Sequence, residues 1–170
     1  RLRSRGLGDV YKRQAQVIAR NPDFDLQGRD FLNHIDFDAG TVDYFGTTYP
    51  LLDCDFPTVD PAHPTVLTAD EGKVIAGLVR SFAESERLQR HVQFLYAHGA
   101  FYKMCNGNLL YHGAVPMTEN GAFAAITFEG VARSGKALFD YCDRRARQGY
   151  SAPQGSPARL AGQDFLWYLW

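Results

Sequence analysis

The clearest helical pattern in the chain lies between residues 68 and 98. Thr68 lies three residues before Glu71, which is the spacing of a capping box. In a capping box the threonine side chain bonds the backbone N–H of the glutamate, and the glutamate side chain bonds the backbone N–H of the threonine. We expect a first helix from there, a second helix from Ser85, and an end to that second helix at Gly99. The apolar residues that fall on one face of the first helix are Val74, Ile75, Leu78, Val79 and Phe82. In the second helix the inward positions are Leu88, Val92, Leu95 and Tyr96.

A different period marks residues 33–52, where apolar and polar side chains alternate as in half-buried strands. A turn at 38–41 and Gly46 divide this stretch into three short strands, so the pattern predicts an antiparallel meander. Residues 53–64, rich in Pro and Asp, are expected to form a surface loop.

The apolar run Leu109–Tyr111 predicts a buried strand, and Asn106-Gly107 before it predicts a tight hairpin with residues 101–105. His112 follows at the end of that strand, and Gly113 leaves room beside the imidazole. A histidine at the end of a buried strand is well placed to bind a metal, because the sheet fixes its position. From these residues alone, a core histidine bonded to the backbone is the stronger interpretation.

The remainder of the chain predicts a mixture of strands and helices. A second tight turn is expected at 119–121, a strand at 125–128, and helices over 134–147 and 158–170. The helix that starts at Ser134 has Leu138, Phe139, Tyr141 and Cys142 on its inward side. Lys136 in its first turn, and Arg133 just before it, are candidate ligands for a substrate phosphate, on charge and on the expected helix start. A solvated helix start explains the same residues, and the spacing does not match a Walker motif.

Two further groups of metal-binding residue types are weaker candidates. His34, Asp36 and Asp38 share one face of the first predicted strand, and a solvated polar face accounts for them. His91 and His98 lie two helical turns apart, where isolated histidines are usually structural.

Composition narrows the function classes. Of the 170 residues, 45% are hydrophobic and 22% charged, which is typical of a globular domain. Five of the basic residues fall in positions 1–14. Residues 15–170 carry a net charge of −5, which argues against a nucleic-acid partner. Three scattered cysteines favour reduced thiols and a cytoplasmic location. No apolar run reaches the length of a membrane span or a secretory signal, so we expect no membrane partner.

Residues 1–14 (RLRSRGLGDVYKRQ) are interpreted as translated sequencing-adapter read-through and not as native sequence. Two alternatives are a basic RNA-binding arm and an organelle transit peptide. The aromatic run at 165–170 looks cut in mid-element, so residues 15–170 are expected to be one partial domain. Within it we distinguish the meander at about 33–52, a helical segment at about 68–98 and core elements at about 100–170.

Several stretches in combination are similar to one family. They are NHIDFDAGTVDY from Asn33, GTTYPL from Gly46, FPTVD from Phe56, LQRHVQFLY from Leu88, NGNLLYHGAVP from Asn106, GKALFDY from Gly135 and DFLWYLW from Asp164. With these stretches the chain resembles the class 3, or firmicute-type, fructose-1,6-bisphosphatases of the metallophosphoesterase superfamily, as an internal fragment.

The resemblance implies an incomplete calcineurin-like α/β sandwich, with the helices and the meander as an insertion. It implies a phosphoric monoester hydrolase that removes the 1-phosphate of fructose 1,6-bisphosphate in gluconeogenesis, and a homo-oligomer in the intact parent. It also implies a binuclear centre of Mn²⁺, or of another divalent cation such as Mg²⁺, with His112 as one ligand.

The D-x-H, G-D-x-x-D-R-G and G-N-H-[DE] motifs of that superfamily are absent. One histidine cannot hold two cations, so we expect the chain by itself to be inactive. The alternative is a non-catalytic interaction module derived from a metallophosphatase, built on the helices at 69–98 and the meander at 34–52.

Overall fold

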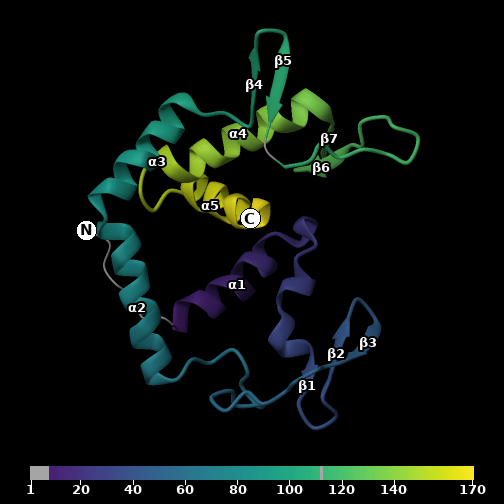
Figure 1. Ribbon diagram of the computed structural model, residues 1–170, viewed down its shortest axis with the longest axis vertical. Helices are drawn as coiled ribbons and strands as arrows, with labels where there is room; N and C mark the ends of the chain where they lie inside the picture. Colours follow the sequence, from purple (N-terminus) through teal and green to yellow (C-terminus); the bar gives the residue numbers. More distant parts are fainter. Residues whose placement is uncertain (1–7, 112) are drawn as a thin grey trace. The chain divides into compact units, whose positions relative to one another are not determined.

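The computed structural model describes residues 8–111 and 113–170, with side chains from residue 14 onward. It is a mixture of helices and small antiparallel sheets, as the sequence predicts, and it divides into two compact units after Ser85 (Figure 1). The division falls inside the predicted helical segment at 68–98, between its two helices.

The first unit contains helix α1 (Gly8–Arg20) and three short 3-10 turns at Pro22–Phe24, Gln27–Arg29 and Phe31–His34. Strands β1 (Ile35–Asp36), β2 (Thr41–Tyr44) and β3 (Thr47–Pro50) follow as an antiparallel sheet in that order, which confirms the meander. The first strand is shorter than expected, because residues 31–34 form a 3-10 turn. From residue 14 onward, the buried side chains of this unit are Val17, Leu26 and Val42.

Helix α2 (Ala69–Glu84) completes the first unit and begins at the predicted capping box. The Thr68 hydroxyl accepts from the Glu71 backbone N–H, and the Glu71 carboxylate accepts from the Thr68 N–H at 2.7 Å. Thr58 in the preceding loop also donates to Glu71, at 2.6 Å. This last bond is the largest cause of the lowered pKa of Glu71, and the same carboxylate therefore ties the loop to the helix start.

The second unit runs from helix α3 (Glu86–His98) through two hairpins to a pair of helices. One hairpin joins β4 (Tyr102–Cys105) to β5 (Asn108–Tyr111), and the other joins β6 (Ile126–Phe128) to β7 (Val131–Arg133). Between them, a tight turn at 118–122 confirms the second predicted turn. Helices α4 (Gly135–Ser151) and α5 (Pro157–Leu169) follow, so the first of the two continues four residues beyond its predicted end.

The three hairpins with two-residue loops, β2–β3, β4–β5 and β6–β7, turn through two residues with positive φ, the second of which is glycine. The pairs are Phe45-Gly46, Asn106-Gly107 and Glu129-Gly130. This backbone matches the right-handed twist of the flanking strands, and glycine adopts it without steric cost. Asn106-Gly107 was predictable, whereas Glu129-Gly130 was not, because glutamate is not a typical left-handed residue.

The core of the second unit lies where α4 and α5 pack together. Phe165 is fully buried, with its ring 5.2 Å from that of Phe128 and 5.4 Å from that of Tyr141. Of the four inward positions predicted for α4, Leu138, Tyr141 and Cys142 are buried and Phe139 is half-buried. Gly149 and Gly162 let the backbones touch, because a Cβ atom built on Gly162 would lie 2.2 Å from the Gly149 nitrogen.

Two burial predictions about this unit are wrong. Leu109–Tyr111 forms the predicted strand, but the strand is not buried, because Leu109 and Leu110 are each 52% exposed and Tyr111 is 49% exposed. The apolar run correctly indicates a strand, but among the described residues this strand has one partner, in a two-stranded sheet. Leu95 of α3, expected to point inward, is likewise 63% exposed.

Candidate functional site

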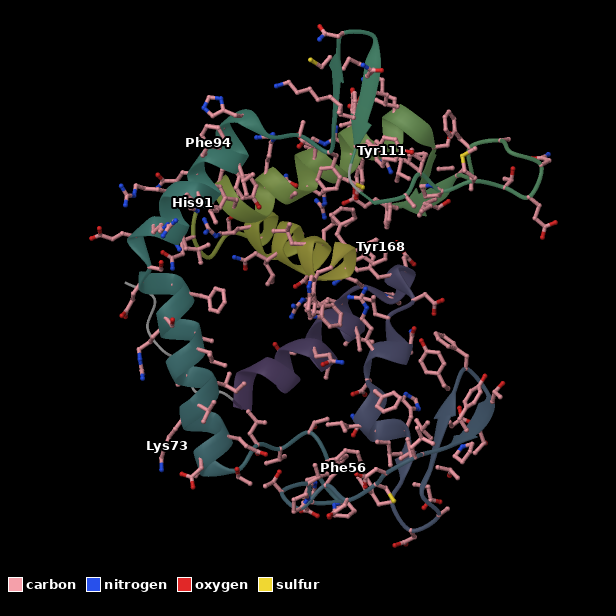
Figure 2. All side chains as sticks on the ribbon, in the orientation of Figure 1. Phe56, Lys73, His91, Phe94, Tyr111 and Tyr168 are labelled. Carbon is pink, nitrogen blue, oxygen red and sulfur yellow. The ribbon has the colours of Figure 1, made fainter. Side chains whose placement is uncertain are left out.

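The β4–β5 hairpin, which leads to His112, meets the first turns of α4, where Lys136 lies. Figure 2 shows Tyr111 at the end of the hairpin nearest α4. Tyr111 pairs with Tyr102, and both rings lie 6.2 Å from the ring of Phe139. Phe139 therefore supports the end of the hairpin from which the chain continues to the predicted metal ligand.

His112, the predicted metal ligand, lies outside the described residues. Gly113 directly after it has a φ of 87°, in the left-handed region that favours glycine. A side chain at this position would strain the backbone. The backbone conformation therefore favours glycine at position 113, in addition to the room beside the imidazole that the sequence indicates.

Lys136 lies in the first turn of α4, beside the hairpin. Its Nζ donates to Oδ2 of Asp140 at 2.6 Å and lies 5.6 Å from the centre of the Tyr102 ring. The hydroxyl of Tyr102 donates to the other carboxylate oxygen, Oδ1, at 3.1 Å. The bond to Asp140 raises the pKa of Lys136, and the same bond lowers the pKa of Asp140. Lys136 is therefore a firmly protonated ammonium that an anion would have to draw away from Asp140.

Arg133, the other predicted phosphate ligand, is occupied by the backbone. Its Nη1 donates to the carbonyl oxygens of Phe128 and Val131, both at 2.9 Å. Its guanidinium carbon lies 4.1 Å from the centre of the Tyr141 ring, within cation–π range. These contacts fix the β6–β7 turn against α4, which makes Arg133 a structural residue in this arrangement.

The other histidines and acids do not gather into a metal site. Among the described residues, no group of three or more His, Cys, Asp and Glu side chains could hold a metal ion. The Asp36 carboxylate accepts backbone N–H bonds from Asp38 and Ala39, so it stabilises the turn. His98 lies with its ring 4.6 Å from Phe94, on the helix that also carries His91 (Figure 2).

Arg147 is a structural centre of the second unit that no sequence pattern indicates. Arg147 donates to the backbone oxygens of Tyr96 and Gly99, the latter at 2.6 Å, and to Asp143 at 2.6 Å. The hydrogen bond to Asp143 raises the pKa of Arg147 above its ordinary value. Beside it the Tyr96 and Tyr150 rings stack at 4.0 Å. A shallow recess of about 290 Å³ opens here, lined by Gln93, Tyr96, Ala97, Arg147, Tyr150 and Ser151.

Comparison with known proteins decides the family. The model of the Firmicute fructose-1,6-bisphosphatases matches residues 10–170. The chain belongs to this family. A class 3 fructose-1,6-bisphosphatase of Clostridium novyi (strain NT) is 45% identical over 160 residues. Relatives with the same name in Clostridioides difficile (strain 630) and Bacteroides fragilis (strain YCH46) are 42% and 41% identical over 160 residues. In each case the match covers 94% of this chain.

The chain spans about a quarter of the length of these fructose-1,6-bisphosphatases, 24% in all three. The family match begins at residue 10, so it includes residues 10–14 of the stretch interpreted as adapter read-through, and α1 also runs through them. Residues 1–7 lie outside the described residues. No solved structure matches the chain significantly, and no helix among the described residues is long and apolar enough to cross a membrane.

Proposed function

We propose that the chain is a segment of a fructose-1,6-bisphosphatase that hydrolyses the 1-phosphate of fructose 1,6-bisphosphate, as a step of gluconeogenesis in the cytoplasm. The observation that carries the proposal is the family match over residues 10–170, with relatives of that name at 38–45% identity. In this proposal the segment belongs to a calcineurin-like sandwich that other parts of the intact protein complete. The intact protein then acts on a sugar bisphosphate and forms a homo-oligomer.

The proposed binuclear centre of Mn²⁺, or of Mg²⁺, does not fit the described residues by themselves. Two cations need several donor side chains converging on one point, and no such group occurs among them. We therefore propose His112 as one ligand, with the others supplied from outside residues 1–170. We expect the 170-residue chain alone to release no phosphate.

The contacts of the two phosphate candidates support Lys136 over Arg133. Lys136 is exposed, and the Asp140 carboxylate that it bonds is also exposed, so Lys136 can exchange that partner for a phosphate oxygen. Arg133 would have to leave two carbonyl groups and an aromatic ring. We propose Lys136 as the substrate contact and Arg133 as a support for the turn.

The test uses an intact chimera, in which this chain replaces the matched quarter of the Clostridium novyi relative. Mn²⁺-dependent release of phosphate, with fructose 6-phosphate as the sugar product, supports the proposal. His112→Ala is expected to reduce kcat/KM at least about 100-fold. A chimera that binds Mn²⁺ and keeps full activity without His112 would refute the metal assignment.

Lys136→Met tests the phosphate contact. It is expected to raise KM for the bisphosphate about 10-fold or more, because a charge-assisted bond contributes about 1.5–3 kcal/mol. Lys73→Met is the matched control, since Lys73 forms a similar exposed pair with Asp70 on α2, at 2.7 Å. Equal effects of the two substitutions would show that Lys136 does not contact the substrate.

A further inference from the structure

Strand β5 is apolar on both faces. The register places Leu109 on the same face as Tyr111, toward α4, and Leu110 on the opposite face beside Lys103. Both leucines are 52% exposed. A strand with large apolar residues on both faces is typical of a sheet that is covered by a layer on each side. A two-stranded hairpin needs packing against other elements to be stable in water, and here α4 contacts it at the Tyr102–Tyr111 end through Phe139 and Asp140.

The outer edge of β5 is also open. In a two-residue hairpin, the residues next to the turn exchange both backbone hydrogen bonds, and the pairs then alternate along the strands. Leu109 and Tyr111 therefore direct their N–H and C=O groups away from β4. Figure 1 shows the hairpin extending beyond α4, with no third strand in the described part of the second unit pairing with it.

Natural proteins protect a lasting free edge with proline, a bulge or charged side chains. Within Asn108–Tyr111, β5 has none of these, and every side chain is uncharged. Such an edge is suited to permanent cover by the same polypeptide and not to intermittent contact with a foreign partner. The relatives supply a source for the cover, because three-quarters of their length lies outside the matched segment.

We propose that β5 is an interior strand of the intact protein. A strand from outside residues 1–170 pairs with its outer edge, and the same part of the protein buries Leu110. The proposal rests on the family match and on the hairpin, and it does not depend on the proposed catalytic activity.

The first measurement is residue-resolved amide exchange in the intact chimera described above. Asn108 and Leu110, which face β4, are the internal reference for Leu109 and Tyr111, which face outward. Pairing of the outer edge predicts that the outward amides exchange within about 10-fold of the inward ones. A free edge predicts exchange about 1,000-fold faster at the outward positions, which would overturn the proposal.

The second measurement identifies the cover. A photo-crosslinking residue, p-benzoylphenylalanine, replaces Leu110 in the chimera, and the same residue at the exposed Glu119 in the turn at 118–122 gives the background. A crosslink within one molecule to a peptide from outside residues 1–170 supports the proposal. A crosslinked dimer would assign the face to a second copy, and a crosslink to residues up to Ser85 would assign it to the first unit. Either result overturns the proposal.

If the chimera does not fold, amide exchange in the unaltered Clostridium novyi relative gives the same decision. Protection of alternate outward amides in the strand aligned with Asn108–Tyr111 supports the proposal, and rapid exchange there overturns it.

Discussion

Helices α2 and α4 are of nearly equal length, 16 and 17 residues, and each has a clear apolar face, yet they use it differently. In α4 six residues are buried, and most of its apolar face packs against α5 and the β6–β7 turn. In α2 no residue is buried, and Leu78 and Val79 are 52% and 55% exposed. The helical period of apolar residues therefore indicates which face of a helix would pack against other elements. It does not indicate which element, if any, packs there.

The largest expected effect separates two matched leucines. Leu138 in α4 is 3% exposed, so Leu138→Ala should lower the free energy of unfolding by about 2–5 kcal/mol. Leu78→Ala in α2 should cost less than about 1 kcal/mol, because the side chain is already half in water. Urea unfolding of the chain, or of the chimera, measures both values. Equal costs would mean that α2 is covered in solution.

Glycines give the second comparison. Gly162→Ala places a methyl group against the backbone of α4 and should destabilise the protein by about 1–3 kcal/mol, as overpacking does. A Cβ atom on Gly77 in α2 meets nothing within 4 Å, so Gly77→Ala should stabilise the helix by about 0.5–1 kcal/mol. Opposite shifts in the thermal midpoint are the expected result. A lower thermal midpoint for Gly77→Ala would show that another part of the protein lies close to Gly77.

The third prediction concerns the contribution of the N-terminal cap of α2 to stability. Thr68→Ala removes the side-chain acceptor for the Glu71 N–H and should cost about 1 kcal/mol. Ser134, before α4, makes no side-chain cap bond, so Ser134→Ala should change stability by only a few tenths of that amount. Helix content by circular dichroism along the urea transition distinguishes them. Similar losses at both positions would show that Ser134 caps α4 in solution.

The smallest effect at neutral pH concerns Cys142. Burial raises the pKa of this thiol from its ordinary value near 9 to about 11. The unfolded state then loses its proton first, so the contribution to stability is complete below pH 9 and is lost as the pH rises toward 11. Exposed Cys54 and Cys105 should react rapidly with a thiol reagent at pH 8, and Cys142 slowly. Three equal reaction rates would contradict burial of Cys142.

Local chemistry made much of the fold predictable. The capping box at Thr68, the Asn106-Gly107 turn and the inward face of α4 each depend on neighbouring residues, and each has the predicted structure. The burial of β5 was not predictable, because it depends on a layer that no local pattern describes. The β6–β7 turn was missed, since Glu129 adopts positive φ through the surrounding structure and not by its own preference.

The sequence indicated candidate residues for the site, but it did not indicate their contacts. The sequence indicated Lys136 at a helix start, but it could not show that this helix start lies beside the β4–β5 hairpin, where Asp140 and Tyr102 already contact the ammonium. Arg133 and Arg147 have structural roles set by backbone carbonyls up to 51 residues away, which no spacing rule contains.

The contact between Gly149 and Gly162 also has a consequence for the order of folding. These glycines are close in the chain, so bringing them together closes a short loop and costs little chain entropy. The Arg147 bonds to Tyr96 and Gly99 close loops of 51 and 48 residues, and they should form later. We expect the α4–α5 hairpin to be the nucleus of its unit, so that Gly162→Ala slows refolding, whereas loss of the Arg147 contacts mainly accelerates unfolding.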